Sequence, residues 1–394
     1  MARLATEAVS ASRPATLPSR EDLLIAMNLS QRLSRPALCR LAAELDTWLE
    51  EPDPKVCAKR IGVPSLQIGR ANEIRRDAAR LAGEERMRAD QQGVQILTAL
   101  DAAYPPSFAQ LSLPPPVLYL RGRREALRPP RAVAIVGSRR MDAYGRECVE
   151  LFARELAQNG LLIVSGFAIG IDSLAHDRAL EAGGSTVGIL GCGLDIDYPK
   201  GSRGRAAAIA KNGALLTEFP LGCQPRPFNF PIRNRLIAAL ADATLVVQAK
   251  LRSGSLITAN HALDLGRDVF AIPGRIFDEL AMGTNNLIAD GAHPAHCPKD
   301  ILERLGVEPV ERQPEPLPEV AAEGAEKEET GPTPAKGKSG KILKCLAKTL
   351  DGMPAEDLAI TLDLPLDQIL GLLLELELEG RIERWPGPVY VARR

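Results

Sequence analysis

Six short, almost wholly apolar runs follow one another in the middle of the chain, and segments with a helical hydrophobic pattern separate them. A run that is apolar throughout, with no alternation, indicates a strand that is buried on both faces. Such strands alternating with helices form a parallel sheet that helices cover on both sides. The sequence therefore predicts a doubly wound, mostly parallel α/β domain. Its predicted strands are Ala132–Val136, Leu161–Ser165, Thr186–Leu190, Ala214–Thr217, Thr244–Val247 and Asp268–Ile272.

Two further regions precede this sheet. Residues 1–20 contain no long apolar stretch, and we expect a flexible leader there and no signal peptide. Residues 21–91 have apolar positions at three-to-four spacing, interrupted by Pro and Gly, which predicts a small helical domain. Two short strands, at 93–98 and 116–120, then join the α/β domain, which is expected to extend over residues 92–305.

The composition changes after residue 305. Residues 306–340 are rich in Pro, Glu, Gly and Lys, with eight acidic residues against four basic ones. This stretch cannot bury enough apolar surface to fold, so we expect a linker. Residues 341–394 show three helical segments and a short hairpin, the pattern of a winged-helix domain.

The third helix of this winged-helix domain is acidic. It contains Asp367, Glu375, Glu377 and Glu379 and no basic residue. Acidic side chains that face DNA phosphates lower affinity. We therefore expect this domain to contact protein, or a second copy of the chain, and not duplex DNA.

The spacing of cysteine and histidine argues against disulfides and metal sites. The seven cysteines are dispersed, with no CxxC pair, which is typical of reduced thiols in the cytoplasm. His293, His296 and Cys297 form a short cluster, but a second ligand cluster is missing. We therefore expect a polar turn there and no bound metal. Since no run of about 18 apolar residues occurs, we expect no membrane span.

The net charge of −1 does not by itself indicate a nucleic-acid partner, but the basic residues are unevenly distributed. Residues 199–240 contain seven basic residues and a single acidic residue, Glu218. An anion-binding patch can lie within a neutral protein.

The loops after the predicted strands suit anions, and in a parallel sheet such loops meet at one edge. Gly137-Ser138-Arg139 follows the first strand, Gly166 follows the second, and Ser253-Gly254-Ser255 follows the fifth. Glycine at such turns lets backbone N–H groups point at an anion beside a helix N-terminus. Arg139, and Lys200 after the third strand, would add full charges for phosphate oxygens.

Other ligands and chemistries have less support. A dinucleotide site needs a GxGxxG loop, and ATP hydrolysis needs a Walker A loop; the sequence has neither. His176 could act as a base, but Ser173 lies only three residues before it on one predicted helix. We expect Asp172 to cap that helix and His176 to be structural, so neither a cofactor nor a catalysed reaction is expected. Several anion loops along one edge suit a polymer of phosphates held in a groove.

A series of short motifs occurs along the central domain. They are VAIVGSR at 133–139, YG at 144–145, SG at 165–166 leading to His176, YP at 198–199, FPIRNR at 230–235, SGSLITA at 253–259 and VFAIPG at 269–274. In this order they are similar to the DNA-processing protein A (DprA/Smf) family, over about residues 95–292. The resemblance implies an extended Rossmann-like domain that works as a homodimer and binds single-stranded DNA. It also implies protection of incoming DNA and loading of the RecA recombinase during natural transformation and recombination, and a SAM-like fold for the N-terminal helices.

Matching the family motifs residue by residue gives a set of candidate contacts. The resemblance implies DNA or phosphate binding at Gly137, Ser138, Arg139, Gly166, Lys200, Arg233, Asn234, Arg235, Ser253, Gly254, Ser255 and Thr258. Phe219, Phe228 and Phe230 are candidate base-stacking platforms, and core packing is the alternative for each of them.

Two positions depart from the family pattern. Where a hydroxyl residue is usual just before Tyr-Gly, this chain has Asp142-Ala143. An aspartate near a phosphate loop would repel the ligand unless it caps the following helix. Ser202 replaces an asparagine that is common three residues after Tyr-Pro, and its side chain is a shorter donor.

Two other classes of function compete with a DNA-binding protein. A nucleotide-cleaving phosphoribohydrolase has a related fold, but it carries a Pro-Gly-Gly-x-Gly-Thr loop with a nearby catalytic glutamate, which this chain lacks. A small-molecule sensor coupled to the winged helix would need an acidic ribose site or a basic recognition helix, and neither is seen.

Overall fold

The computed structural model describes residues 18–309, except 31 and 52, and residues 338–346, 353–362, 364–378, 381–385 and 389–392. The chain divides into two compact units, residues 1–312 and 313–394. Most of the predicted leader and most of the predicted linker lie outside the described residues.

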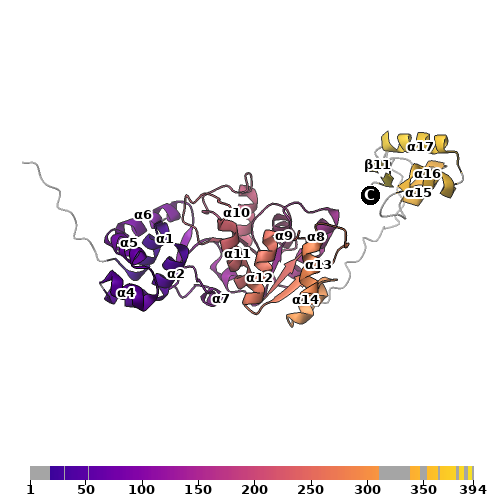
Figure 1. Cartoon of the computed structure of the whole chain (residues 1–394). Coiled ribbons are helices and arrows are strands. Elements are labelled where there is room, and N and C mark those ends of the chain that lie inside the picture. Colours follow the sequence, from indigo (N-terminus) through magenta and orange to yellow (C-terminus); the bar gives the residue numbers. More distant parts are fainter. Residues whose placement is uncertain are drawn as a thin grey trace, which may run out of the picture. The chain divides into compact units, whose positions relative to one another are not determined.

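A nine-stranded sheet forms the centre of the first unit, with the strand order β1-β2-β6-β5-β4-β3-β7-β8-β9. Figure 1 shows the N-terminal helices grouped at one end of this α/β region. The strands from β6 to β9 are parallel to their neighbours, and β1 and β2 form an antiparallel edge. The prediction of a mostly parallel doubly wound sheet is therefore confirmed. The strands are β1 Gln95–Thr98, β2 Val117–Gly122, β3 Ala132–Val136, β4 Leu162–Ser165, β5 Thr186–Ile189, β6 Ala214–Thr217, β7 Ala243–Val246, β8 Asp268–Ala271 and β9 His293–Pro294.

The order of the strands reverses beside β3. After β3 the chain adds β4, β5 and β6 on one side, and then crosses back to place β7, β8 and β9 on the other. The two loops that leave β3 and β7 therefore separate toward opposite faces of the sheet. In this fold, a crevice forms at such a reversal, outside the carboxyl ends of the strands.

Helices cover both faces of the sheet because residues along each strand point alternately to the two sides. Val133 and Ile135 of β3 pack with α8 Ala143–Gln158, α9 Ile171–Glu181 and α14 Pro298–Arg304. Ala132 and Ala134 face the opposite layer. That layer contains α7 Pro106–Ala109, α11 Asn229–Leu240, α12 Gly254–Asp264 and α13 Met282–Ala289.

The N-terminal helices pack directly against the β1–β2–β6 part of the sheet. Their core continues into that of the sheet, since Leu24 and Met27 belong to one hydrophobic cluster with Tyr119 and Leu215. The helical region and the α/β region, which the sequence separates into two domains, thus lie within one compact unit. The helices are α1 Arg20–Leu29, α2 Arg35–Ala43, α3 Leu45–Glu50, α4 Pro54–Ile61, α5 Ser65–Arg76 and α6 Ala78–Gln91.

The second unit has its own small core and a three-stranded sheet in the order β10-β12-β11. Glu375 and Glu377 are exposed on its third helix, while the side chains of Asp367 and Glu379 lie outside what the structure describes. Its elements are α15 Lys338–Leu346, β10 Met353–Pro354, α16 Ala355–Leu362, α17 Leu366–Leu378, β11 Ile382–Trp385 and β12 Val389–Ala392.

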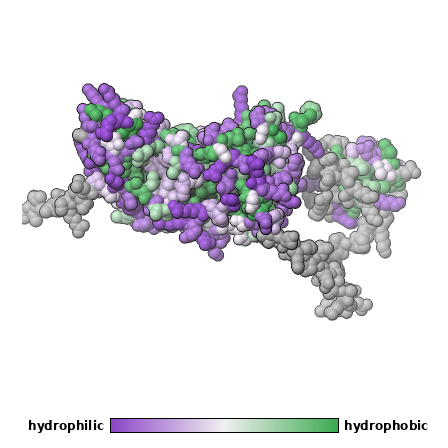
Figure 2. All heavy atoms as spheres, turned by 90° about the horizontal axis from the view of Figure 1, so that it is seen from below, coloured by the Kyte–Doolittle hydropathy of each residue, from purple (hydrophilic) through white to green (hydrophobic). Residues whose placement is uncertain are grey.

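On the face shown in Figure 2, hydrophobic residues lie in small groups among hydrophilic ones. Of the helices in the described ranges, none is long and apolar enough to cross a membrane. None of the seven cysteines, all of which lie in the described ranges, forms a disulfide. The His293–Cys297 segment includes the turn that begins α14, where the Asp300 carboxylate accepts hydrogen bonds from the backbone N–H groups of His296 and Cys297.

Candidate functional site

A groove of about 880 Å³ lies across the carboxyl ends of the strands, at the reversal between β3 and β7. The loops after the six strands from β3 to β8 form its walls, together with α11. This is the edge where the sequence predicts anion loops, so the fold brings those loops together.

The loop after β3 supplies the first basic side chain of the groove. A Cβ atom on Gly137 would lie 2.4 Å from Cδ1 of Ile171, so a side chain has no room there. Ser138 Oγ accepts a hydrogen bond from the Arg140 N–H at 3.0 Å and turns the loop. Arg139 is exposed, and its guanidinium carbon lies 5.3 Å from the ring centre of Phe230. The aromatic ring orients this cation and leaves it accessible to a ligand.

The loop after β7 presents the N-terminus of α12 to the groove. Ser253 caps the helix, and its Oγ lies 2.7 Å from Oγ of Ser255. The Asn234 side chain donates to the Gly254 carbonyl at 3.1 Å and fixes the loop from α11. Thr258 also lines the groove, although it is buried. The helix dipole and the first N–H groups of α12 favour an anion here.

Three further basic residues line the groove, and the motif comparison does not identify them: Arg140, Lys250 and Arg252. Lys250 forms an ion pair with Glu279. Arg140 and Arg252 are exposed, and neither has an ion-pair partner within the described part of the chain. Arg252 could have been predicted from its position directly before the serine that caps α12, a helix that begins at a glycine. At such a position a cation and the helix dipole act on the same anion.

Arg233 lies on the floor of the groove, but its guanidinium is used internally. It is 3% exposed and donates to the carbonyl oxygens of Gly166 and Ile189, at the ends of β4 and β5. Burial lowers the pKa of Arg233 to about 10, so it stays charged at neutral pH. Burial also raises the pKa of the Asp172 carboxyl, and the positive charge of Arg233 counteracts this. We therefore correct the expectation that Arg233 is free to bind phosphate.

Gly166 likewise serves the internal structure. It is buried, and a Cβ atom on it would lie 2.5 Å from Asp172 Oδ2 and 2.8 Å from Arg233 Nη2. The missing side chain leaves space for this charged pair, and the residue does not line the groove.

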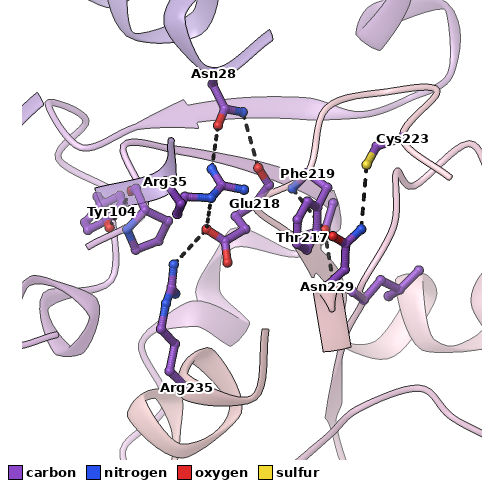
Figure 3. Close-up of polar contacts among 11 residues, drawn as sticks. Asn28, Arg35, Tyr104, Thr217, Glu218, Phe219, Cys223, Asn229 and Arg235 are labelled. Atoms are coloured by element: carbon purple, nitrogen blue, oxygen red, sulfur yellow. Dashed lines mark hydrogen bonds and ion pairs between the residues drawn. The ribbon is translucent and has the colours of Figure 1, made fainter. Parts of the chain in front are cut away.

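Arg235 lies outside the groove, in a polar cluster between α2, the end of β6 and α11 (Figure 3). Its Nη2 atom is 2.7 Å from Oε2 of Glu218, and Nε of Arg35 is 3.4 Å from the same oxygen. Phe219 is 6% exposed beneath the Arg35 guanidinium. We correct the expectations for Arg235 and Phe219, because both side chains pack the N-terminal helices against the sheet.

The remaining predicted contacts divide between the groove and the surface around it. Phe230 lines the groove and packs against Tyr198, with ring centres 5.5 Å apart. Phe228 is 58% exposed just before α11. Lys200 is exposed, but it is not one of the residues that line the groove.

Both departures from the family pattern have a structural explanation. Asp142 caps α8, accepting from the Gly145 N–H at 2.8 Å and from the Gln248 side chain at 2.7 Å. Its charge is thereby satisfied within the fold. Ser202 is buried, and its hydroxyl donates to Asp197 at 3.3 Å, within the turn that precedes α10 Arg203–Asn212.

His176 is structural, as expected. It is fully buried, with Nδ1 2.6 Å from Oγ1 of Thr186. The Thr186 hydroxyl donates its own proton to the Ile163 carbonyl, so His176 Nδ1 carries the proton and donates. Asp172 is not the capping residue of α9; that position is Gly170.

The burial of His176 predicts a pH dependence of stability. Burial lowers the pKa of His176 from 6.5 to about 3, so between these values the unfolded chain binds a proton that the folded protein excludes. Stability is therefore lost as the pH falls below about 6.5. From about pH 7.5 to about pH 5, wild type should lose roughly 2 kcal/mol more unfolding free energy than a His176→Phe variant in urea denaturation. Equal losses in the two proteins would contradict this assignment.

Comparison with known proteins identifies the family. The model of the DNA recombination-mediator protein A family matches residues 95–306, and that of the DprA winged helix domain matches residues 326–388. The chain belongs to the DNA recombination-mediator protein A family. DNA processing protein DprA of Streptococcus pneumoniae is 43% identical over 203 residues, which cover 52% of this chain and 71% of the relative.

Longer alignments and a solved structure agree with this assignment. Protein Smf of Escherichia coli is 36% identical over 308 residues, which cover 77% of this chain and 79% of the relative. The X-ray structure of DprA from Streptococcus pneumoniae is similar with a TM-score of 0.62 and 35% identity, over 73% of this chain and 98% of that one. The family match thus spans residues 95–306, and the family's winged helix domain follows at residues 326–388.

Proposed function

We propose that the protein binds single-stranded DNA, without sequence preference, in the groove at the strand reversal. The observation that carries this proposal is the meeting of Arg139, Arg140 and Arg252 with the N-terminus of α12 in one groove. Backbone N–H groups and these guanidinium groups would hold successive phosphates. The partly exposed rings near the groove favour a single strand, since its bases are free to stack.

We further propose that the bound strand is protected and passed to the RecA recombinase during transformation or recombination, in the cytoplasm and by a homodimer. Family membership supports this role, and the acidic third helix of the winged-helix unit supports a protein partner for that unit.

We propose no catalysed reaction. The acidic side chains that line the groove are Asp172 and Glu279. The first is buried beside Arg233 and the second is paired with Lys250. A general acid or base has to reach the ligand and exchange a proton with it. The pairing of both carboxylates with basic side chains does not favour this role.

The test is binding of a labelled oligothymidylate and of a duplex of equal length, between about 50 and 200 mM salt. We expect tight single-strand binding that weakens steeply with salt, and much weaker duplex binding. Equal affinity for both, or no binding at low salt, would contradict the proposal. In that case nucleotides would be screened as small ligands of the groove.

A further inference from the structure

The loop between β8 and α13 carries two neighbouring apolar side chains at its tip. Ile276 is 76% exposed, and Phe277 is 93% exposed, the highest value for any large hydrophobic side chain that the structure describes. An aromatic ring left in water gains nothing from the hydrophobic effect on folding. Such a ring suggests either a loosely held loop or a surface that contacts a ligand.

This loop is held firmly at both ends. The Asn285 side chain accepts from the Gly274 N–H and donates to the Gly274 carbonyl, each at 3.1 Å. The Tyr144 hydroxyl donates to the Pro273 carbonyl at 2.9 Å. After the tip, the Leu280 carbonyl accepts from the Ala249 N–H at 2.7 Å. The tip is therefore presented on a fixed base, and a loose loop does not explain its exposure.

The base of the loop is part of the groove wall. Glu279 and Leu280 line the groove, and Glu279 is paired with Lys250, which lines it as well. Phe277 is two residues from Glu279, so its backbone lies within about 7 Å of the wall. Because β7 and β8 are parallel neighbours, the Arg252 loop ends at the same edge of the sheet.

We propose that Phe277 is a base-stacking site at the β8 end of the groove, for a nucleobase of a single strand whose phosphates lie between Arg139 and Arg252. This inference rests on the proposed function. The ring lies two residues beyond Glu279, whose charge is paired with Lys250, at the edge of the sheet where the Arg252 loop ends. It is therefore placed to meet the base attached to a phosphate that Arg252 holds. Aromatic stacking tolerates every base, which suits a strand bound without sequence preference.

A protein partner fits the tip less well. One aromatic side chain buries about 150–250 Å², whereas a stable protein interface needs roughly 800 Å² on each partner. The tip alone is too small for that, but it is large enough for one base.

The test compares wild type, Phe277→Ala and Phe277→Trp in binding a labelled oligothymidylate and a matched abasic oligonucleotide. We expect Phe277→Ala to bind oligothymidylate about tenfold more weakly, with an unchanged salt slope, since no phosphate contact is lost. Phe277→Trp should restore affinity. All three proteins should bind the abasic strand with the same affinity.

Leu66→Ala is the matched control, because Leu66 is 64% exposed on α5, does not line the groove and is expected to leave affinity unchanged. If wild type binds oligothymidylate and Phe277→Ala binds it equally well, the stacking site is wrong and the proposed function stands. If wild type does not bind, the proposed function fails as well. If Phe277→Ala lowers the affinity for the abasic strand as much as that for oligothymidylate, and also changes the sedimentation coefficient, the tip is a contact between copies of the chain.

Discussion

Replacing both Arg139 and Arg252 with alanine should raise the Kd for single-stranded DNA roughly 150-fold, or about 3 kcal/mol. These are exposed guanidinium groups on the loops after β3 and β7, on the two sides of the strand reversal. Each replacement removes one charge-assisted contact with a phosphate and the counter-ion release that accompanies this contact. The slope of log K against log salt should therefore become shallower by about 1.4.

A charge-matched control separates this effect from a general loss of positive charge. Arg76 and Arg154 are exposed and do not line the groove. Changing both to alanine alters the net charge equally but should shift the Kd by less than about threefold. Fluorescence anisotropy at several salt concentrations measures both variants. Similar losses in the two double variants would show that the DNA lies elsewhere.

Replacing Glu218 with glutamine should lower the free energy of unfolding by about 3 kcal/mol. The carboxylate is fully buried, and Arg35 and Arg235 both reach its Oε2 atom (Figure 3). Asn28 supports the cluster by accepting from Arg35 at 2.9 Å and donating to the Glu218 carbonyl at 3.2 Å. Without the negative charge, two partly buried guanidinium groups face each other uncompensated, and the contact between α2 and the sheet weakens.

Glu84→Gln is the comparison for this prediction. Glu84 pairs with Arg80 along α6 with both side chains more than half exposed, so its loss should cost less than about 0.5 kcal/mol. Adding Arg235→Met to Glu218→Gln should recover part of the stability, because one uncompensated cation is removed. Urea denaturation of the full chain measures all three. A Glu218→Gln variant as stable as Glu84→Gln would contradict a role for this cluster in joining the helices to the sheet.

Local patterns in the sequence were sufficient for the strands and for the loops that follow them. All six predicted strands form within a residue of the expected bounds, because fully apolar runs separated by helical segments pack well only as a covered parallel sheet. The same reasoning places Gly137, Arg139 and Ser253 at one edge, since parallel strands end at the same side. The N-terminal helices attach to the sheet through a shared hydrophobic cluster and through the buried Glu218 carboxylate, which is contacted from two elements. No local pattern reveals these contacts.

The run Arg233-Asn234-Arg235 shows what only the tertiary structure decided. The sequence determined that these residues are polar and follow the fourth predicted strand of the central domain, and it could not say which way each one points. Successive residues on a helix are about 100° apart, so Arg235 turns away toward Glu218 while Asn234 holds the α12 loop. Arg252 has no motif of its own, yet it lines the groove because β7 lies next to β3. The chemical type of each residue and the positions of the strands along the chain come from the sequence itself. The order of the strands in the sheet and the direction of each side chain come from tertiary packing, here the packing of α11 on the sheet.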